Sequence, residues 1–145
     1  YHLQASRKQV KQIWLDLLIG LYPQRTKYMQ RMSAHFGLAL LSNTSMFHFE
    51  HYQDECAAMF DAMDHLFVSF EMRVTKPQPE IYLMALEQMG WKAEETLFLD
   101  DSQTNIRAAD ALGIQTLWIE RPEMFEEVCQ VLLDLRQKKI PIDRK

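Results

Sequence analysis

The clearest structural pattern in this chain is the segment Thr96-Leu-Phe-Leu-Asp-Asp-Ser-Gln-Thr-Asn-Ile-Arg-Ala-Ala-Asp-Ala-Leu-Gly113. Residues 96–99 form an apolar run that predicts a strand buried on both faces, and the carboxylates of Asp100 and Asp101 follow it directly. The apolar residues after the acids take helical spacing, and Gly113 stands where a left-handed helix cap is expected. Because ligands of parallel α/β sheets bind beyond the carboxyl ends of the strands, we expect both carboxylates at the site-forming edge, where they would attract a cation.

The same alternation of strands and helices extends on both sides of this stretch. Apolar runs predict further strands at 38–41, 65–70 and 114–119. Apolar stripes and well-placed prolines predict helices at 5–18, at about 21–36, and after Pro79 and Pro122. Residues 45–63 mix aromatic and polar side chains without a clean period, and there we expect an irregular loop that leads into a short helix. The pattern predicts an α/β fold, with a Rossmann-like parallel sheet and helices on both of its faces.

Composition narrows the classes of function. The 145 residues are the size of one domain, and the 48% hydrophobic and 25% charged residues are typical of a soluble globular protein. No segment approaches the roughly 20 apolar residues of a membrane span. The net charge of −4 gives no basic surface for nucleic acid, so we expect a small ligand and neither a nucleic acid nor a membrane as partner. Cys56 and Cys129 have no disulfide or metal spacing, which favours reduced thiols and a cytoplasmic location.

Polar side chains follow the ends of several predicted strands. Ser42, Asn43 and Thr44 come after the strand at 38–41, Lys76 lies beyond the strand at 65–70, and the two carboxylates end the strand at 96–99. Right-handed crossovers between parallel neighbours would bring these groups to one edge of the sheet. A lysine with hydroxyl and backbone N–H donors holds a phosphate or carboxylate, and paired aspartates hold a hard cation such as Mg²⁺. The pattern therefore predicts metal-assisted phosphate chemistry.

Each of these signals also has a simpler structural explanation. Ser42 and Thr44 are residue types that turns and helix caps use more often than ligand sites do. Lys76 could be a solvated loop charge, and one aspartate of the pair could cap the following helix. His48 and His51 have a spacing that metal ligands can have, but no third ligand follows at a recognisable distance, so we expect surface or loop histidines. The carboxylate pair is the strongest single signal, because a cap requires only one carboxylate.

Taken together, the polar strand ends resemble motifs of the haloacid dehalogenase superfamily of aspartate-nucleophile phosphatases. Leu-Ala-Leu-Leu-Ser-Asn-Thr at 38–44 resembles its second motif, Lys-Pro-Gln-Pro-Glu-Ile-Tyr at 76–82 its third, and Leu-Phe-Leu-Asp-Asp-Ser-Gln-Thr-Asn-Ile at 97–106 its fourth. Their order and spacing match, and the resemblance covers about 37–135. The form of the motifs resembles the branch with a small helical cap, which includes sugar-phosphate phosphatases. The resemblance implies that residues 1–20 are the C-terminal part of that cap and that 21–145 form the α/β core.

The resemblance also implies an activity and a role for each residue. The activity is Mg²⁺-dependent hydrolysis of a small phosphomonoester, of the sugar-phosphate type, through an aspartyl-phosphate. Ser42 and Lys76 would be catalytic, with Ser42 binding the phosphoryl group and Lys76 neutralising its charge. Substrate binding is expected from Ser42, Asn43, Thr44 and Lys76, and metal binding from Asp100 and Asp101, directly or through water. Asn105 stands where some relatives carry a further acid.

The first motif of that family has no counterpart here. It is an apolar strand ending in Asp-x-Asp that supplies the nucleophile and the general acid, and no Asp-x-Asp occurs in the 145 residues. In the family that strand lies between those ending here at Ser42 and Asp100, so its absence leaves backbone groups unpaired. We therefore expect a C-terminal portion of a longer protein, inactive alone, whose sheet is completed by upstream residues or a complementary chain. The alternatives are a non-catalytic binding or scaffold protein and a 2-haloacid dehalogenase, which uses no metal.

Overall fold

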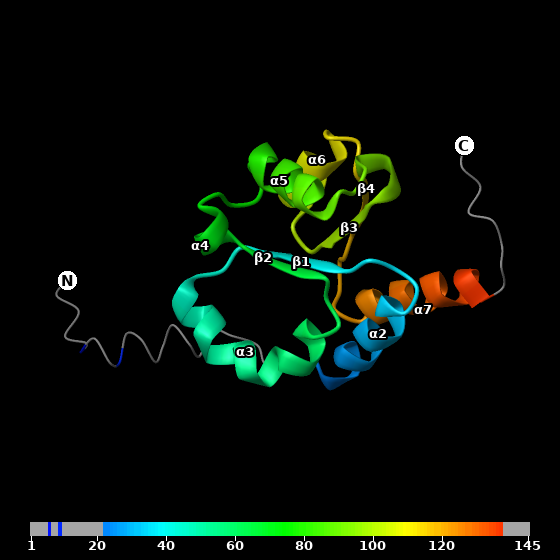
Figure 1. Ribbon diagram of the computed structural model, residues 1–145, viewed down its shortest axis with the longest axis horizontal. Coiled ribbons are helices and arrows are strands. Elements are labelled where there is room, and N and C mark those ends of the chain that lie inside the picture. The colour runs from blue at the N-terminus through cyan, green and yellow to red at the C-terminus, as the bar shows by residue number, and fades with distance from the viewer. Residues whose placement is uncertain (1–5, 7–8, 10–21, 138–145) are drawn as a thin grey trace.

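The computed structural model describes Ser6, Gln9 and residues 22–137 (Figure 1). The predicted helix at 5–18 lies outside these residues except for Ser6 and Gln9, and so does the expected end of a cap at 1–20. The helices and strands of residues 22–137 are, in order, α2 (Pro23–Ser33), β1 (Ala39–Ser42), α3 (Met46–Phe60), β2 (His65–Val68), α4 (Ser69–Met72), α5 (Pro79–Met89), the 3-10 helix η1 (Ala93–Glu95), β3 (Leu97–Asp100), α6 (Gln103–Asp110), β4 (Gln115–Trp118) and α7 (Met124–Gln137). No helix of this described part is long and apolar enough to cross a bilayer.

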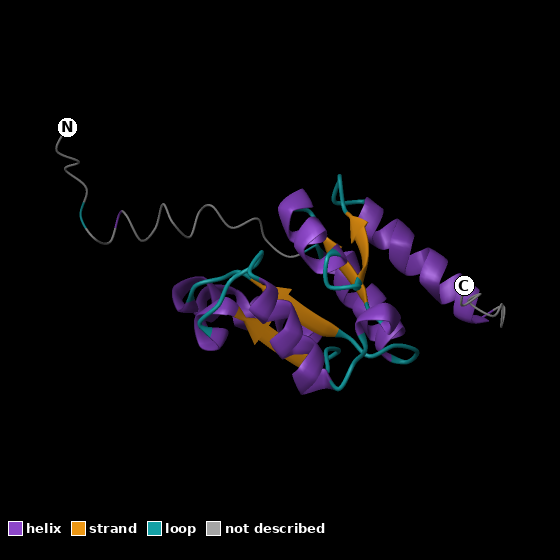
Figure 2. Ribbon diagram, turned by 90° about the horizontal axis from the view of Figure 1, so that it is seen from above, coloured by secondary structure: helices purple, strands orange, loops and turns teal. Residues whose placement is uncertain are grey.

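The strands form two parallel pairs. β1 pairs with β2, with Ser42 opposite Val68, and β3 pairs with β4, with Asp100 opposite Trp118. Among residues 22–137 no ladder joins β1 to β3, and Figure 2 shows the two pairs as separate ribbons. The parallel α/β fold is confirmed. The break in the sheet falls between β1 and β3, where the resemblance places a further strand.

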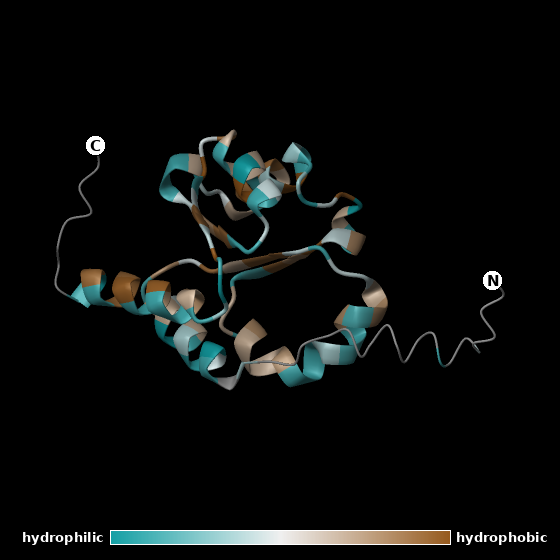
Figure 3. Ribbon diagram, turned by 180° about the vertical axis from the view of Figure 1, so that it is seen from behind, coloured by the Kyte–Doolittle hydropathy of each residue, from teal (hydrophilic) through white to brown (hydrophobic). Residues whose placement is uncertain are grey.

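Helices cover both faces of the strands. One buried cluster joins α2 to α7 and contains Met29, Met32, Cys129 and Leu133. A second cluster joins α5 to α6 and contains Ile81, Tyr82, Ala109 and Ile114. Figure 1 shows α5 and α6 on one side of β1 and β2, with α2, α3 and α7 on the other. Figure 3 shows polar and hydrophobic residues alternating along α7, as an amphipathic helix at a surface requires. The predicted arrangement of helices on both faces is confirmed.

The prediction of an irregular loop in 45–63 is wrong, because most of this segment is the regular helix α3. Ser45 caps it by accepting a hydrogen bond from the backbone N–H of His48 at 3.3 Å. Phe49 stacks on Phe60 with ring centroids 5.8 Å apart and meets Tyr52 edge-on at 5.7 Å. These aromatic residues share one helical face. The sequence gives little sign of this face, because it is only partly buried and polar residues stand between its aromatic residues.

Element ends differ from the predictions by a few residues at most. β2 ends at Val68, and the residues predicted to continue it begin the short helix α4 instead. Pro79 begins α5 as predicted, and Gly90 ends it in the left-handed conformation with φ of 64°. The left-handed φ of 80° at Gly113 also agrees with the prediction, although it lies beyond the last residue of α6. The strands therefore end close to the predicted site residues.

Candidate functional site

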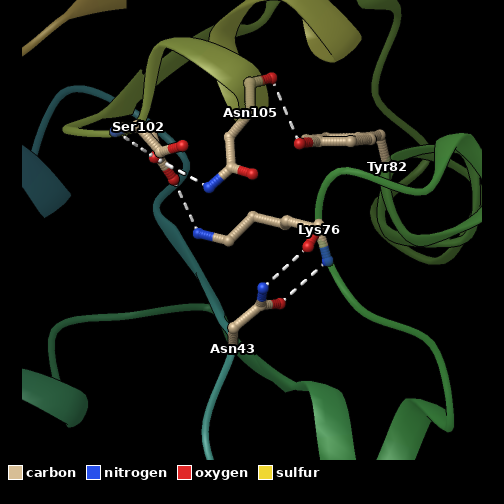
Figure 4. Close-up of polar contacts among 6 residues, drawn as sticks. Asn43, Lys76, Tyr82, Ser102 and Asn105 are labelled. Atoms are coloured by element: carbon tan, nitrogen blue, oxygen red, sulfur yellow. Dashed lines mark hydrogen bonds and ion pairs between the residues drawn. The ribbon is translucent and has the colours of Figure 1, made fainter.

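Lys76 links the carboxyl ends of β1 and β3 (Figure 4). Its Nζ lies 2.7 Å from Asp100 Oδ2, and the two side chains are only 10% and 5% exposed. The main chain of Lys76 is held by Asn43, whose Nδ2 donates to the Lys76 carbonyl and whose Oδ1 accepts from the Lys76 N–H, both at 2.8 Å. The predicted convergence of these strand ends at one edge is therefore observed. Ser42, the last residue of β1, lies directly before Asn43.

Asp100 is fixed by donors from the turn and helix that follow β3. Its Oδ1 accepts from the backbone N–H of Ser102 at 2.8 Å and from Asn105 Nδ2 at 2.9 Å. With Lys76 on Oδ2, three donors hold one carboxylate, and hydrogen bonds to an ionised group are short and strong. The sequence places these donors well, since Ser102 is the residue directly before α6 and Asn105 lies in its first turn. Little accepting capacity on Asp100 is left for another ligand.

Asp101 lies beside this network and is exposed to solvent. Its backbone carbonyl accepts from Trp118 Nε1 at 2.9 Å, which ties it to the end of β4. Within the described part of the chain, no group of three or more acids, histidines or cysteines is placed to bind a metal. Mg²⁺ keeps several waters and is usually bound by one or two carboxylates plus substrate oxygens. Exposed Asp101, with Asp100 acting mainly through water because three donors already occupy it, is a carboxylate pair compatible with such a site.

Thr44 follows Asn43 in the turn after β1 and contacts Ser69, the first residue of α4. Its backbone N–H donates to Ser69 Oγ at 3.1 Å, and that hydroxyl donates back to the Thr44 carbonyl at 3.0 Å. The Thr44 hydroxyl lies 3.4 Å from the hydroxyl of Tyr52. These contacts hold the turn together and match the simpler structural explanation for Thr44. A role for Thr44 in substrate binding stays a prediction.

Two aromatic residues belong to the site and were not assigned a role from the sequence. The Tyr82 hydroxyl donates to the Asn105 carbonyl at 3.2 Å, and its ring meets Phe98 edge-on at 5.4 Å. Lys76 Nζ lies 5.5 Å from the centroid of Phe98, within the range of a cation–π contact. Burial raises the pKa of Tyr82 to about 12, and the nearby charge of Asp100 adds to the shift. Tyr82 is thus a neutral hydrogen-bond donor at neutral pH.

The other candidate residues do not join the site. His48 and His51 lie on α3, and no metal-binding cluster of described residues includes either. Cys56 and Cys129 are free and buried, which agrees with the expectation of reduced thiols. Burial raises the pKa of both thiols, that of Cys129 to about 11, so neither is a ready nucleophile.

Comparison with known proteins gives consistent matches. The family model of the haloacid dehalogenase-like hydrolases matches residues 4–113. D-ribitol-5-phosphate phosphatase of Bacteroides thetaiotaomicron is 26% identical over 136 residues, which are 90% of this chain and 66% of that protein. A crystal structure of a HAD (haloacid dehalogenase) family enzyme from the same species has a TM-score of 0.80 at 27% identity, covering 86% of this chain and 64% of that one. A mutant of that enzyme in complex with magnesium and inorganic phosphate has a TM-score of 0.73 at 28% identity, covering 79% and 62%.

These relatives are longer than the chain, which spans 66% of the curated protein and 64% of the first crystal structure. The family match nevertheless extends over most of the sequence and includes the ends of β1 and β3. It agrees with the parallel α/β fold and with the convergence of Asn43, Lys76 and Asp100 at one edge. The chain therefore belongs to the family of haloacid dehalogenase-like hydrolases.

Proposed function

We propose that this protein is a Mg²⁺-dependent phosphomonoester hydrolase that acts on a small phosphorylated metabolite of the sugar-phosphate type. The observation that carries the proposal is the buried Lys76–Asp100 ion pair, set beside the end of β1 and next to a second carboxylate. The similarity to D-ribitol-5-phosphate phosphatase supports the substrate class. The similarity to a HAD family enzyme crystallised with magnesium and phosphate supports the metal.

Asp101 and Asp100 would hold the metal. Asp101 is exposed and open to an ion, whereas Asp100 already accepts from three donors and would act mainly through water. Mg²⁺ bound there would polarise the phosphoryl oxygens and offset their charge. Asn105 contributes by holding Asp100, since its side-chain amide donates to that carboxylate at 2.9 Å.

Ser42 and Lys76 would bind the phosphoryl group. The Ser42 hydroxyl can donate to a phosphoryl oxygen, and the Lys76 ammonium can offset the negative charge of both the phosphoryl group and an attacking carboxylate. The Lys76 side chain is only 10% exposed, so the electrostatic effect of its charge is weakened little by solvent. Fixed charges of this kind supply much of the rate enhancement in phosphoryl transfer.

The nucleophile would come from a strand seated between β1 and β3. An apolar cavity of about 80 Å³ lies there, lined by Leu41 and Phe67 from one strand pair, by Phe98 from the other, and by residues of α5. The free edges of β1 and β3 carry backbone groups that a strand could pair with. An aspartate at its carboxyl end would lie near Lys76. It would attack phosphorus and release an alcohol protonated by a second aspartate, and water would then hydrolyse the aspartyl-phosphate.

Two other functions remain distinguishable from this one. A 2-haloacid dehalogenase needs no metal, so the adjacent carboxylates of Asp100 and Asp101 favour the phosphatase. A non-catalytic binding or scaffold protein needs no nucleophile, so the strand between β1 and β3 would then lack a reactive carboxylate. The sequence of that strand separates the scaffold from both enzymes.

The test is hydrolysis of p-nitrophenyl phosphate and of a panel of sugar and alditol phosphates by the intact protein. We expect hydrolysis with Mg²⁺, its loss in EDTA, and a fall of at least about 100-fold in Asp100→Asn, since that change removes a charge that places both Lys76 and the metal. Asp110→Asn is the matched control, because it removes an exposed carboxylate at the far end of α6. EDTA-resistant activity, a fully active Asp100→Asn protein, or halide release from 2-haloacids would contradict the proposal.

A further inference from the structure

Asn43 uses both ends of its side-chain amide on one residue far along the chain. Its Nδ2 donates to the carbonyl of Lys76 and its Oδ1 accepts from the N–H of Lys76, at 2.8 Å each, across 33 residues of sequence. Figure 4 shows the amide turned toward the main chain of Lys76 and joined to it by two hydrogen bonds. An amide engaged on both sides cannot turn to a substrate without breaking these bonds.

Lys76 is held at three points along its length. Asn43 fixes its main chain, Phe98 lies under its ammonium with 5.5 Å between Nζ and the ring centroid, and Asp100 pairs with the ammonium at 2.7 Å. A lysine side chain has four methylene carbons joined by rotatable bonds. Its ammonium is therefore placed accurately only if the backbone that carries the side chain is also fixed. The Asn43 contacts provide that fixed point and join the turn after β1 to the loop before α5.

We propose that Asn43 is a positioning residue that clamps the main chain of Lys76 and thereby sets the place of its ammonium. This role differs from substrate contact, which the family resemblance implied for Asn43. The inference rests on the proposed function for the task of Lys76, the binding of a phosphoryl group. A displacement of the ammonium by about 1 Å can reduce catalysis by about 100-fold, so loss of the clamp has a measurable effect.

The test is a double-mutant cycle in the intact protein with Asn43→Ala, Lys76→Met and the double variant. The readouts are the affinity for orthophosphate in the presence of Mg²⁺, kcat/KM for two phosphomonoesters with different leaving groups, and amide hydrogen exchange at Lys76. We expect Asn43→Ala to lower orthophosphate affinity and kcat/KM by about 10- to 100-fold, equally for both substrates, and to expose the Lys76 amide to exchange. On the Lys76→Met background, Asn43→Ala should change either quantity by less than about two-fold.

Ser69→Ala is the matched control. Ser69 holds the main chain of Thr44, the next residue of the same turn, with two hydrogen bonds but does not contact Lys76. It should lower stability and leave kcat/KM within about three-fold of the wild type.

Additive effects in the double variant, or a loss that depends on the leaving group, would assign Asn43 to substrate contact and overturn the inference. A wild-type protein that neither hydrolyses phosphomonoesters nor binds orthophosphate would refute the proposed function instead. In that case the exchange rate of the Lys76 amide still tests whether Asn43 holds the Lys76 main chain. Unchanged protection of that amide in Asn43→Ala would show that Asn43 does not hold it.

Discussion

Tyr82 connects the core of the molecule to the site. It is 2% exposed, its hydroxyl donates to the Asn105 carbonyl, and Asn105 in turn donates to Asp100. Because burial, with the charge of Asp100 adding, raises the pKa of Tyr82 to about 12, the folded protein keeps the phenol proton over a pH range in which the unfolded chain, with a pKa near 10, loses it. The folded state then binds more protons than the unfolded state. The stability contributed by Tyr82 is therefore complete below about pH 10 and falls between about pH 10 and pH 12.

Replacing this residue by phenylalanine should change how stability depends on pH. At pH 8, Tyr82→Phe should lower the free energy of unfolding by about 1 kcal/mol, because the Asn105 carbonyl loses its donor. Between about pH 10 and 12 the wild type should lose about 2–3 kcal/mol that the variant does not lose. Cys129, whose pKa is also raised, affects both proteins equally between about pH 9 and 11. Urea unfolding curves over this range test the prediction, and a constant difference between the two proteins would contradict it.

At the residue scale, the sequence predicted which side chains meet but not how they are held. The proximity of Lys76 and Asp100 followed from strands that end at one edge, and the structure confirms it. The clamp by Asn43 and the ring of Phe98 under the lysine join residues from separate segments, and no local pattern records such contacts. Apolar strand residues such as Phe98 look the same in sequence whether they serve only the core or also a site.

Just before β1, the backbone at Gly37 lies close to the side chains of Trp91 and Asp64. A Cβ on Gly37 would lie 2.7 Å from Cζ2 of the Trp91 indole and 3.3 Å from Oδ2 of Asp64. The same Asp64 oxygen accepts from the backbone N–H of Leu38 at 2.8 Å, so the carboxylate is not free to move away. Glycine is therefore required at position 37 because a side chain there would clash with its neighbours, and not because of its backbone conformation.

Gly37→Ala should lower the free energy of unfolding by about 1–3 kcal/mol through overpacking. In a Trp91→Leu background the clash with the indole is absent, so the same change should cost clearly less, and the two substitutions should be non-additive. Chemical denaturation of the four proteins in the cycle measures this coupling. Strictly additive losses would show that the indole does not set the limit at Gly37.

At the element scale, the sequence was most informative where special residues mark the ends. Pro79 and Gly90 bound α5 as predicted, because a proline suits the first helical turn and a glycine suits a left-handed cap. Most of α3 was predicted as a loop leading into a short helix, because its aromatic face gives a weak helical period and the Ser45 cap alone is a common signal. β2 was predicted too long because Ser69 and Phe70 extend an apolar run into α4.

On the scale of the whole molecule, the break between β1 and β3 organises both the fold and the proposed chemistry. Each strand pair has a helical layer, yet the two pairs share no hydrogen-bonded ladder in the described chain. The cavity beside the break is lined by apolar side chains, which favour an apolar strand as occupant. A parallel strand seated in this break would pair with the free edges of both β1 and β3 and would end near Lys76.

Amide hydrogen exchange and thermal unfolding of a polypeptide limited to residues 1–145 test whether the sheet needs a strand between β1 and β3. Without a strand between them, β1 and β3 expose apolar edges, so we expect this polypeptide to be aggregated or molten, without a cooperative transition. In the intact protein the same amides, at 39–42 and 97–100, should be strongly protected, since both strands would lie inside a continuous sheet. A cooperative transition with native-like protection of both strands in the 1–145 polypeptide would contradict the proposed strand order, because the sheet would then close without the strand that is proposed to carry the nucleophile.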